Sequence, residues 1–240
     1  MITNLFHAPS GLWLSIVRIA DQTFAARLAR LGLYEGAEIM RLDETVSIGP
    51  VKVRGKRGEA VLSGRLAGHI VMHLDDDRRL PLLECLPGST GHVEGLTGHE
   101  LLADALRQLG IEENDEIRLV RRMPPMTYRA LIDGRHHEQF DEGLASKLLG
   151  ETDGGGLLQF CSAGVGEDFV VRAIIGSDRS RDILTAMHIR PGVSLVLTSV
   201  SSSQILKFSD DNPVVCVSHD GVRLYFAEKD AHDLIVDDKA

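Results

Sequence analysis

The sequence predicts an all-β fold with short helices, arranged as three tandem small β-barrels of SH3-like size. An amphipathic helix followed by a glycine stop, a turn and a strand occurs three times at a fixed step. Leu28 and Gly32 of the first copy recur 78 positions later as Leu106 and Gly110, and Leu184 continues the step in a third copy. Short strands separated by glycine turns fill the rest of each copy, which is typical of a small closed barrel.

The period divides the 240 residues into three repeats at 1–76, 80–152 and 156–238. The charged run Asp75–Arg79 and the glycine run Gly154–Gly156 are expected to be the linkers between them. Each repeat is close to the size at which a single hydrophobic core is only marginally sufficient, so we expect packing between repeats to matter.

Within the first repeat, five strands and two helical segments follow from the apolar pattern. Gly32 is expected to end the first helix because glycine adopts the left-handed conformation at little cost. The expected strands are 12–19, 38–42, 51–54, 59–62 and 70–74, with a helix ending at residue 32 and a helical turn at 63–68.

The second and third repeats carry the same order of elements. Asp133-Gly134 predicts a tight hairpin turn. The third repeat is about eight residues longer, and the surplus fits best in the polar loop Ser201–Asp211. The expected strands are 91–96, 115–121, 128–132 and 135–140 in the second repeat and 168–175, 193–200, 213–218, 222–226 and 234–236 in the third, with helices at 100–109 and 178–187.

Composition restricts the classes of function. A net charge of −9 disfavours binding to nucleic acid, because an acidic protein repels a phosphate backbone. The longest apolar runs are too short to cross a bilayer and the N-terminus has no secretory signal pattern, so we expect a cytoplasmic protein. Cys85, Cys161 and Cys216 are odd in number and lie among apolar neighbours, which favours reduced thiols.

Ten histidines raise the question of a metal site. His69 and His73 are four apart in a predicted strand, which would separate them by roughly 13 Å, so they are not expected to hold one ion. The best remaining candidates are His92, His99 and Glu100, around a strand-to-helix loop. No nucleophile elbow and no phosphate-binding loop is present, so we expect no enzymatic activity and no resident cofactor.

The three repeats share a set of matching segments, whose most specific part is the Leu-Gly-Leu-x-x-Gly-x-Glu-Ile run of the first repeat. The segments are 27–39, 49–51, 67–71, 86–88, 106–117, 145–148, 184–192, 212–214 and 231–236. The second repeat has Asn114 in place of the turn glycine, and the third lacks the Leu-Gly pair. On these segments each repeat resembles the FeoA domain, the small ferrous iron transport protein A, and the resemblance covers most of the chain.

The resemblance implies SH3-like barrels and a non-enzymatic role, namely contact with the cytoplasmic GTPase domain of the ferrous iron permease FeoB. The protein would then meet a membrane only through this partner. We expect the contact surface to combine the helix end and turn with a basic hairpin, although the hairpin charges also suit a solvated strand edge. The candidate residues are Arg30, Leu33, Tyr34, Glu35, Lys52, Arg54, Lys56 and Arg57.

The sequence leaves other interpretations open. Leu33 also fits core packing, whereas Tyr34 is the better candidate for an exposed anchor. An alternative function is a metal- or small-molecule-sensing module, related to the SH3-like domain of metal-dependent repressors, that binds Fe²⁺ or another ligand between repeats. The arrangement of the repeats and the oligomeric state do not follow from the sequence.

Overall fold

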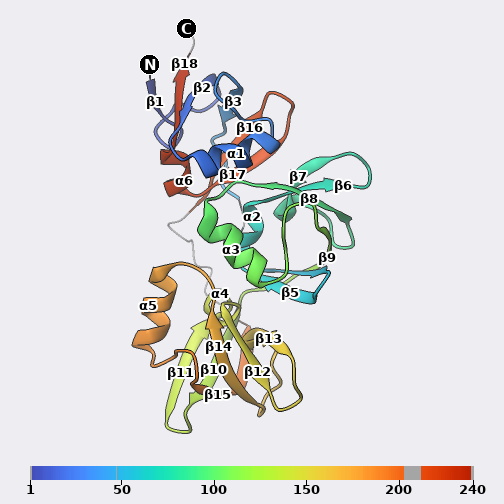
Figure 1. Cartoon of the computed structure of the whole chain (residues 1–240), viewed down its shortest axis with the longest axis vertical. Coiled ribbons are helices and arrows are strands. Elements are labelled where there is room, and N and C mark those ends of the chain that lie inside the picture. Colours follow the sequence, from blue (N-terminus) through green and yellow to red (C-terminus); the bar gives the residue numbers. More distant parts are fainter. Residues whose placement is uncertain (1, 47, 203–211, 239–240) are drawn as a thin grey trace.

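The structure is a computed structural model that describes residues 2–46, 48–202 and 212–238. It is mostly β, with three antiparallel sheets and a few short helices. Figure 1 shows the sheets as three bodies that follow one another along the long axis of the molecule. We call them sheet A, which contains both ends of the described chain, sheet B in the middle, and sheet C.

Each sheet has six strands, and the three sheets have equivalent orders. Written from the equivalent edge, sheet A is β1-β18-β2-β3-β16-β17, sheet B is β7-β6-β8-β9-β4-β5, and sheet C is β13-β12-β14-β15-β10-β11. The strands of sheet A are β1 (Ile2–Asn4), β2 (Trp13–Ile19), β3 (Glu38–Arg41), β16 (Val214–Ser218), β17 (Arg223–Phe226) and β18 (Leu234–Asp238). Those of sheet B are β4 (Val51–Gly55), β5 (Gly58–Leu62), β6 (Ile70–Leu74), β7 (Arg79–Pro81), β8 (Thr90–Leu96) and β9 (Glu116–Arg122). Those of sheet C are β10 (Met126–Ile132), β11 (His136–Asp141), β12 (Leu148–Thr152), β13 (Leu157–Gln159), β14 (Asp168–Ile174) and β15 (Ser194–Ser202).

Three longer helices, each nine residues, follow the strand that opens the helix–turn–strand unit of each sheet. Asp21 caps the first of them, because its carboxylate accepts a hydrogen bond of 2.7 Å from the Phe24 N–H. The helices are α1 (Gln22–Arg30), α2 (Gly64–Gly68), α3 (Glu100–Gln108), α4 (Glu142–Ala145), α5 (Asp178–Ala186) and α6 (Glu228–His232), with 3₁₀ turns at Leu82–Glu84 and Phe160–Ser162. No helix in the described ranges is both long and apolar enough to cross a membrane.

The long helices close in the same way in all three copies. Gly32 and Gly110 have φ of 77° and 75°, and His188 takes the corresponding position with φ of 61°. After each of these residues the next backbone N–H returns to the helix, and the Ile189 N–H donates to the Leu184 carbonyl at 2.8 Å. The third copy therefore keeps the closure without glycine.

The sheets do not follow the repeat boundaries that the sequence predicts. The expected linkers Asp75–Arg79 and Gly154–Gly156 lie instead at hairpin turns inside one sheet, since β6 pairs with β7, which begins at Arg79, and β12 pairs with β13. The chain passes from one sheet to the next in the middle of a repeat, at residues 42–50 and 123–125. Each of sheets B and C therefore joins the second half of one repeat to the first half of the next.

Sheet A is completed by the two ends of the sequence. Its strands β2 and β3 come from the first repeat, and β16, β17 and β18 come from the third. Figure 1 shows these blue and red segments side by side in one body. Most of the expected surplus loop, Ser201–Asp211, lies outside the described residues.

Neighbouring sheets meet through the same kind of contact twice. The helix α1 packs on β8 of sheet B, where a Cβ added to Gly95 would lie 2.9 Å from Leu31. One step along, Ala105 of α3 packs with Leu149 and Ile175 of sheet C. Main hydrophobic clusters lie within each sheet, and Tyr225 of sheet A is buried in the cluster of sheet B. Packing between repeats is thus part of the core.

Candidate functional site

The helix end and turn at 30–35 divide into buried and exposed residues. Leu33 is fully buried in the core of sheet A, so its role is packing. Tyr34 is 59 % exposed and Glu35 is also exposed. Arg30 contacts sheet B, where its guanidinium donates 2.7 Å to the Asn114 side-chain oxygen and 3.4 Å to the Glu94 carbonyl. Arg30 is therefore exposed but paired within the chain, and Tyr34-Glu35 is the exposed part of this candidate surface that the turn itself presents.

The turn that carries Tyr34 has a fixed backbone. The Gly36 N–H donates to the Ile16 carbonyl at 2.7 Å, and the Ala37 N–H donates to the Tyr34 carbonyl at 2.9 Å. Gly36 has φ of 95°, which favours glycine at this point. The turns of sheets B and C make the same cross-strand bond, through the Asn114 and Gly192 N–H groups at 2.8 Å. Asn114 adopts φ of 67°, so its replacement of glycine preserves the turn.

The basic hairpin belongs to sheet B, and its charges have acidic partners. Lys52 and Arg54 each lie 2.6 Å from Glu59, and hydrogen bonding to Lys52 and then Arg54 lowers the pKa of Glu59 to about 2. Lys56 pairs with Asp115, which raises the pKa of the lysine. Glu59 and Asp115 thus partner three of the four basic side chains of this edge hairpin within sheet B.

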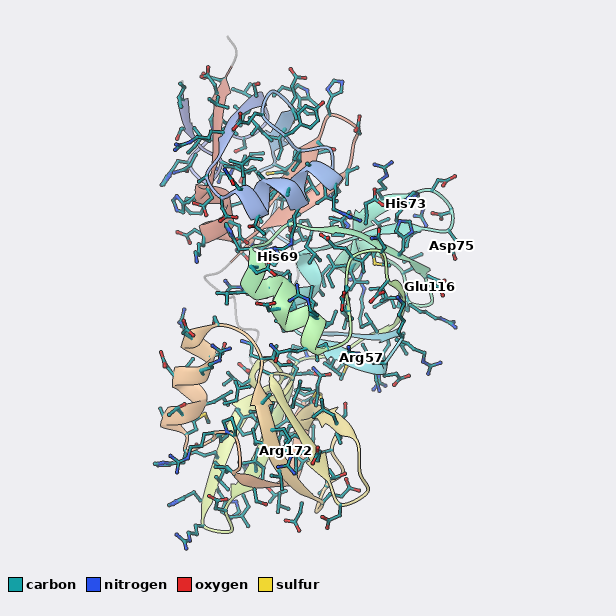
Figure 2. The ribbon with its side chains drawn as sticks, in the orientation of Figure 1. Arg57, His69, His73, Asp75, Glu116 and Arg172 are labelled. Carbon is teal, nitrogen blue, oxygen red and sulfur yellow. The ribbon has the colours of Figure 1, made fainter. Side chains whose placement is uncertain are left out.

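Arg57 lies apart from the Tyr34 turn. Its side chain crosses Gly110 and lines a shallow cavity together with Gly176 and Arg181 of the sheet C body. Figure 2 accordingly shows Arg57 at the side of sheet B that faces sheet C. The two halves of the expected partner surface are therefore on different bodies of the molecule.

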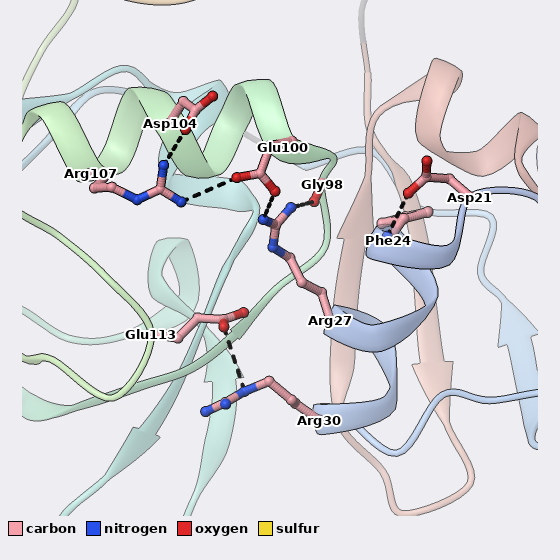
Figure 3. A network of polar contacts seen from close by, with 9 residues as sticks. All are labelled: Asp21, Phe24, Arg27, Arg30, Gly98, Glu100, Asp104, Arg107 and Glu113. Atoms are coloured by element: carbon pink, nitrogen blue, oxygen red, sulfur yellow. Dashed lines mark hydrogen bonds and ion pairs between the residues drawn. The ribbon is translucent and has the colours of Figure 1, made fainter.

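The three metal candidates named from the sequence are not brought together. His99 contacts Asp233 at 2.9 Å and Asp230 at 3.5 Å, and its ring stacks on Phe24 at 4.2 Å between centroids. Glu100 pairs with Arg27 and with Arg107, the latter at 3.2 Å, as Figure 3 shows. These hydrogen bonds, led by that of Arg27, lower the pKa of Glu100. Both residues serve the contact between sheets A and B.

Figure 3 shows how this contact is extended on both sides. Arg27 also donates 3.4 Å to the Gly98 carbonyl, and Arg107 pairs with Asp104 on α3. Arg30 lies 3.8 Å from Glu113. The network therefore fixes α1 of sheet A against the first turn of α3 and the following loop of sheet B.

Sheet B instead brings His92 together with His73 and Glu94, a grouping that the sequence analysis did not predict. His73 Nδ1 lies 3.4 Å and His92 Nε2 lies 3.1 Å from the same oxygen, Glu94 Oε2. The sequence predicts that His73 and His92 both lie on strands. It does not give the register that makes them cross-strand neighbours. Among the described residues, this is a group whose donor atoms all lie within 4.8 Å of one another.

A pocket of about 420 Å³ lies where the three bodies meet. Its charged lining consists of Arg65 of α2, Arg179 of α5 and Lys229 of α6, against the single carboxylate Glu228. His69 also lines it, and burial lowers the pKa of this histidine to about 4, so the ring is neutral at pH 7. Such a lining suits a small anion rather than a cation.

The remaining reactive side chains are inert by position. Cys85 and Cys216 are buried and Cys161 is half-buried, and all three are free thiols. Burial raises the pKa of Cys85 to about 11 and that of Cys161 to about 12, which disfavours the reactive thiolate.

Comparison with models of protein families, with curated proteins and with solved structures finds no match for this chain. Function is therefore inferred from the side chains and their positions.

Proposed function

We propose that this protein is a non-enzymatic, cytoplasmic, FeoA-like accessory or regulator of ferrous iron transport, which acts by contact with the GTPase domain of a FeoB-type permease. In this proposal each six-stranded sheet coils into a small SH3-like barrel. Two observations support the proposal: the FeoA-like sequence pattern of the repeats and the exposed Tyr34 in the turn of sheet A.

The observation that carries the proposal is that all three sheets have the same turn, but only sheet A has an aromatic side chain at the position of Tyr34. Tyr34 corresponds to Glu112 in sheet B and to Arg190 in sheet C, at the same position of the same turn. An aromatic residue with more than half of its surface exposed is a frequent anchor of a protein interface, because it buries a large area and carries a polar tip.

The rigid turn also lowers the entropic cost of binding. Its two backbone hydrogen bonds hold Tyr34 in place before a partner arrives, so fewer torsions must be ordered on association. The neighbouring Glu35 supplies a charge that can orient the encounter. Arg30 and the basic hairpin are already paired within the chain, so their contribution to a partner contact would be smaller.

The test is the affinity of the full chain for the isolated cytoplasmic domain of the permease. We expect Tyr34→Ala to weaken binding at least tenfold, as loss of an interface anchor does. The matched control is Arg190→Ala, which removes the side chain at the same turn position of sheet C and should leave affinity unchanged. Equal affinity of the wild type and Tyr34→Ala would discard this surface, and no binding by the wild type would discard the partner.

A second candidate function is a metal- or small-molecule-sensing module. The observation that favours it is the group of His73, His92 and Glu94 on sheet B. Its metal-binding form is tested by the titrations described below.

A further inference from the structure

The strand register places His73 and His92 side by side. They are direct partners in the pairing of β6 with β8. Cross-strand partners point to the same face of a sheet with their Cβ atoms about 5 Å apart. Their strand neighbours Met72, Leu74 and Val93 are buried in the cluster of sheet B, so the two imidazoles lie on the opposite face.

A β-bulge adds the carboxylate. Val93 pairs with Met72 and Gly95 pairs with Val71, which leaves Glu94 as the extra residue of β8. Bulges often redirect a side chain close to a functional site. Here the bulge residue lies on the imidazole face, and its side chain is only 19 % exposed. The backbone at this point is also tied to sheet A, because Arg30 donates to the Glu94 carbonyl.

The distances from the two imidazoles to Glu94 suit a transition-metal ion, and all three donor atoms lie within 4.8 Å of one another. Metal–nitrogen and metal–oxygen bonds of about 2.1 Å place neighbouring ligand atoms roughly 3.0–3.4 Å apart in octahedral or tetrahedral geometry. The measured separations are 3.1 Å from His92 Nε2 and 3.4 Å from His73 Nδ1 to Glu94 Oε2. The two ring centroids are 4.9 Å apart, so both rings can turn toward one point.

A carboxylate lies near the second ring nitrogen of His73, just beyond hydrogen-bond distance. His73 Nε2, the ring nitrogen that does not face Glu94, lies 3.6 Å from the carboxylate of Asp77. A carboxylate at the second nitrogen fixes the tautomer and the direction of a ligating imidazole. Arg79 lies 3.9 Å from Glu94 Oε1, the other oxygen, and so leaves Oε2 to the histidines.

One more carboxylate, that of Glu116, lies next to this group on the neighbouring strand. Glu116 of β9 is the direct partner of His92 on its other side. Figure 2 shows Glu116 on the same side of sheet B as His73. An ion held by two imidazoles and one carboxylate would therefore retain open coordination positions, with acidic side chains close by to balance its charge.

The equivalent rows of the other sheets show that the fold does not require these residues. In sheet C the positions of His73, His92 and Glu94 are taken by Glu151, Val170 and Arg172. Arg172 donates to Glu151 at 2.8 and 2.9 Å, which makes an ordinary surface ion pair. In sheet A the same positions hold Asp237, Ser15 and Val17.

We propose that His73, His92 and Glu94 form a binding site for a divalent transition-metal ion such as Zn²⁺ or Fe²⁺. Two imidazole nitrogens with one carboxylate favour these ions over Mg²⁺ and Ca²⁺, which prefer oxygen ligands only. The inference is independent of the proposed contact with a permease, because it concerns sheet B and needs no partner.

The test is calorimetric titration of the full chain with Zn²⁺, and with Fe²⁺ under anaerobic conditions, at pH 7.5. We expect about one equivalent of either ion to bind and Mg²⁺ not to compete. His73→Ala, His92→Ala and Glu94→Gln should each weaken binding at least tenfold, since even residues that only orient ligands contribute 10- to 100-fold. All three side chains lie outside the cores, so the variants should fold, which circular dichroism checks.

Two control variants separate this site from general surface binding. His136→Ala removes one ring of a second close histidine pair, His136 and His188, which stack with their centroids 5.6 Å apart in the body of sheet C. Glu151→Gln changes the sheet C counterpart of His73. Both should keep wild-type affinity. Binding that is equal in all variants would overturn the proposal, and so would no binding to the wild type at millimolar metal.

Discussion

Sheets B and C share one backbone plan, yet one row of positions has different chemistry in each. In sheet C a bulge residue, Arg172, forms an ion pair with Glu151 across the strands. In sheet B the corresponding bulge residue is Glu94, whose Oε2 faces two imidazoles while Arg79 lies 3.9 Å from its other oxygen. The strand register and the bulge, which are the same in both sheets, determine which three positions lie close together. The residue types at those positions determine what they can bind.

A second comparison concerns the two junctions between the bodies. Leu31, directly after α1, packs on Gly95 of sheet B, and the equivalent contact on sheet C involves Leu109 and Ala173. On sheet A no helix of the described residues makes the equivalent contact, and Arg18 stands at the position of Gly95 and Ala173. A polar residue at the end of a stack is how repeat proteins prevent further stacking. The described contacts thus favour a stack of three that ends at sheet A.

The largest expected effect is the transfer of the metal site from sheet B to sheet C. Combining Glu151→His, Val170→His and Arg172→Glu should raise the Zn²⁺ stoichiometry from about one to about two, because the register of the two sheets is the same. Calorimetry on the folded variant measures this. A stoichiometry that stays at one would show that the sheet B site depends on more than the row, for example on Asp77.

The next effect tests the junction between sheets B and C. The Gln159 side chain accepts 2.7 Å from the Val61 N–H and donates to the Val61 and Ser146 carbonyls at 2.8 and 2.6 Å. Gln159→Ala leaves these buried groups unpaired and should lower the free energy of unfolding by roughly 2–3 kcal/mol. Urea denaturation measures it. The control Gln139→Ala changes an exposed residue on β11 and should have little effect, and equal losses would contradict the role of Gln159.

The smallest effect depends on pH and concerns Glu142 of sheet C. Its side chain is buried next to the Met126 backbone and the Tyr128 hydroxyl, and burial raises its pKa to about 7. The folded state therefore binds this proton more tightly than the unfolded state, so the glutamate lowers stability as the pH rises from about 4.5 to 7.

Replacing the Glu142 carboxyl with a group that does not ionise should abolish this fall in stability with rising pH. Glu142→Gln is expected to match the wild type at pH 4 and to exceed its free energy of unfolding by roughly 1–3 kcal/mol at pH 8. Thermal melts at the two pH values give the comparison. A difference between variant and wild type that is the same at both values would show that the carboxyl ionises freely in the folded state.

The strands and helices could be predicted from the sequence because their apolar periodicity is local. The expected segments 51–54, 70–74 and 100–109 correspond closely to β4, β6 and α3. The Asp133-Gly134 turn is also present, between β10 and β11. These elements needed no knowledge of distant partners.

The pairing of strands could not be predicted, because a repeated sequence offers each strand several equivalent partners. From the sequence alone, the apolar face of a half-repeat matches the half before it as well as the half after it. Connection length decides between them: the four residues 75–78 join β6 to β7 as a hairpin, whereas the nine residues 42–50 reach the next sheet. Pro124-Pro125, at the true boundary between β9 and β10, was the missed signal.

The candidate site depended on the same missing information. Leu33 and Tyr34 could be separated into packing and exposed residues by the helix closure alone. The grouping of His73, His92 and Glu94 required the register of β6 and β8 and the bulge at Glu94, both of which are set by pairing. His99 and Glu100 were adjacent to His92 only along the chain.

The most direct test of the account is a histidine-detected nuclear magnetic resonance titration of the full chain with Zn²⁺. The chain has ten histidines, and the account predicts that the first equivalent of metal shifts the imidazole signals of His73 and His92 alone. Shifts that appear equally at His99, His136 or His188, or no shift at His73 and His92, would contradict the claim that sheet B alone carries the metal site.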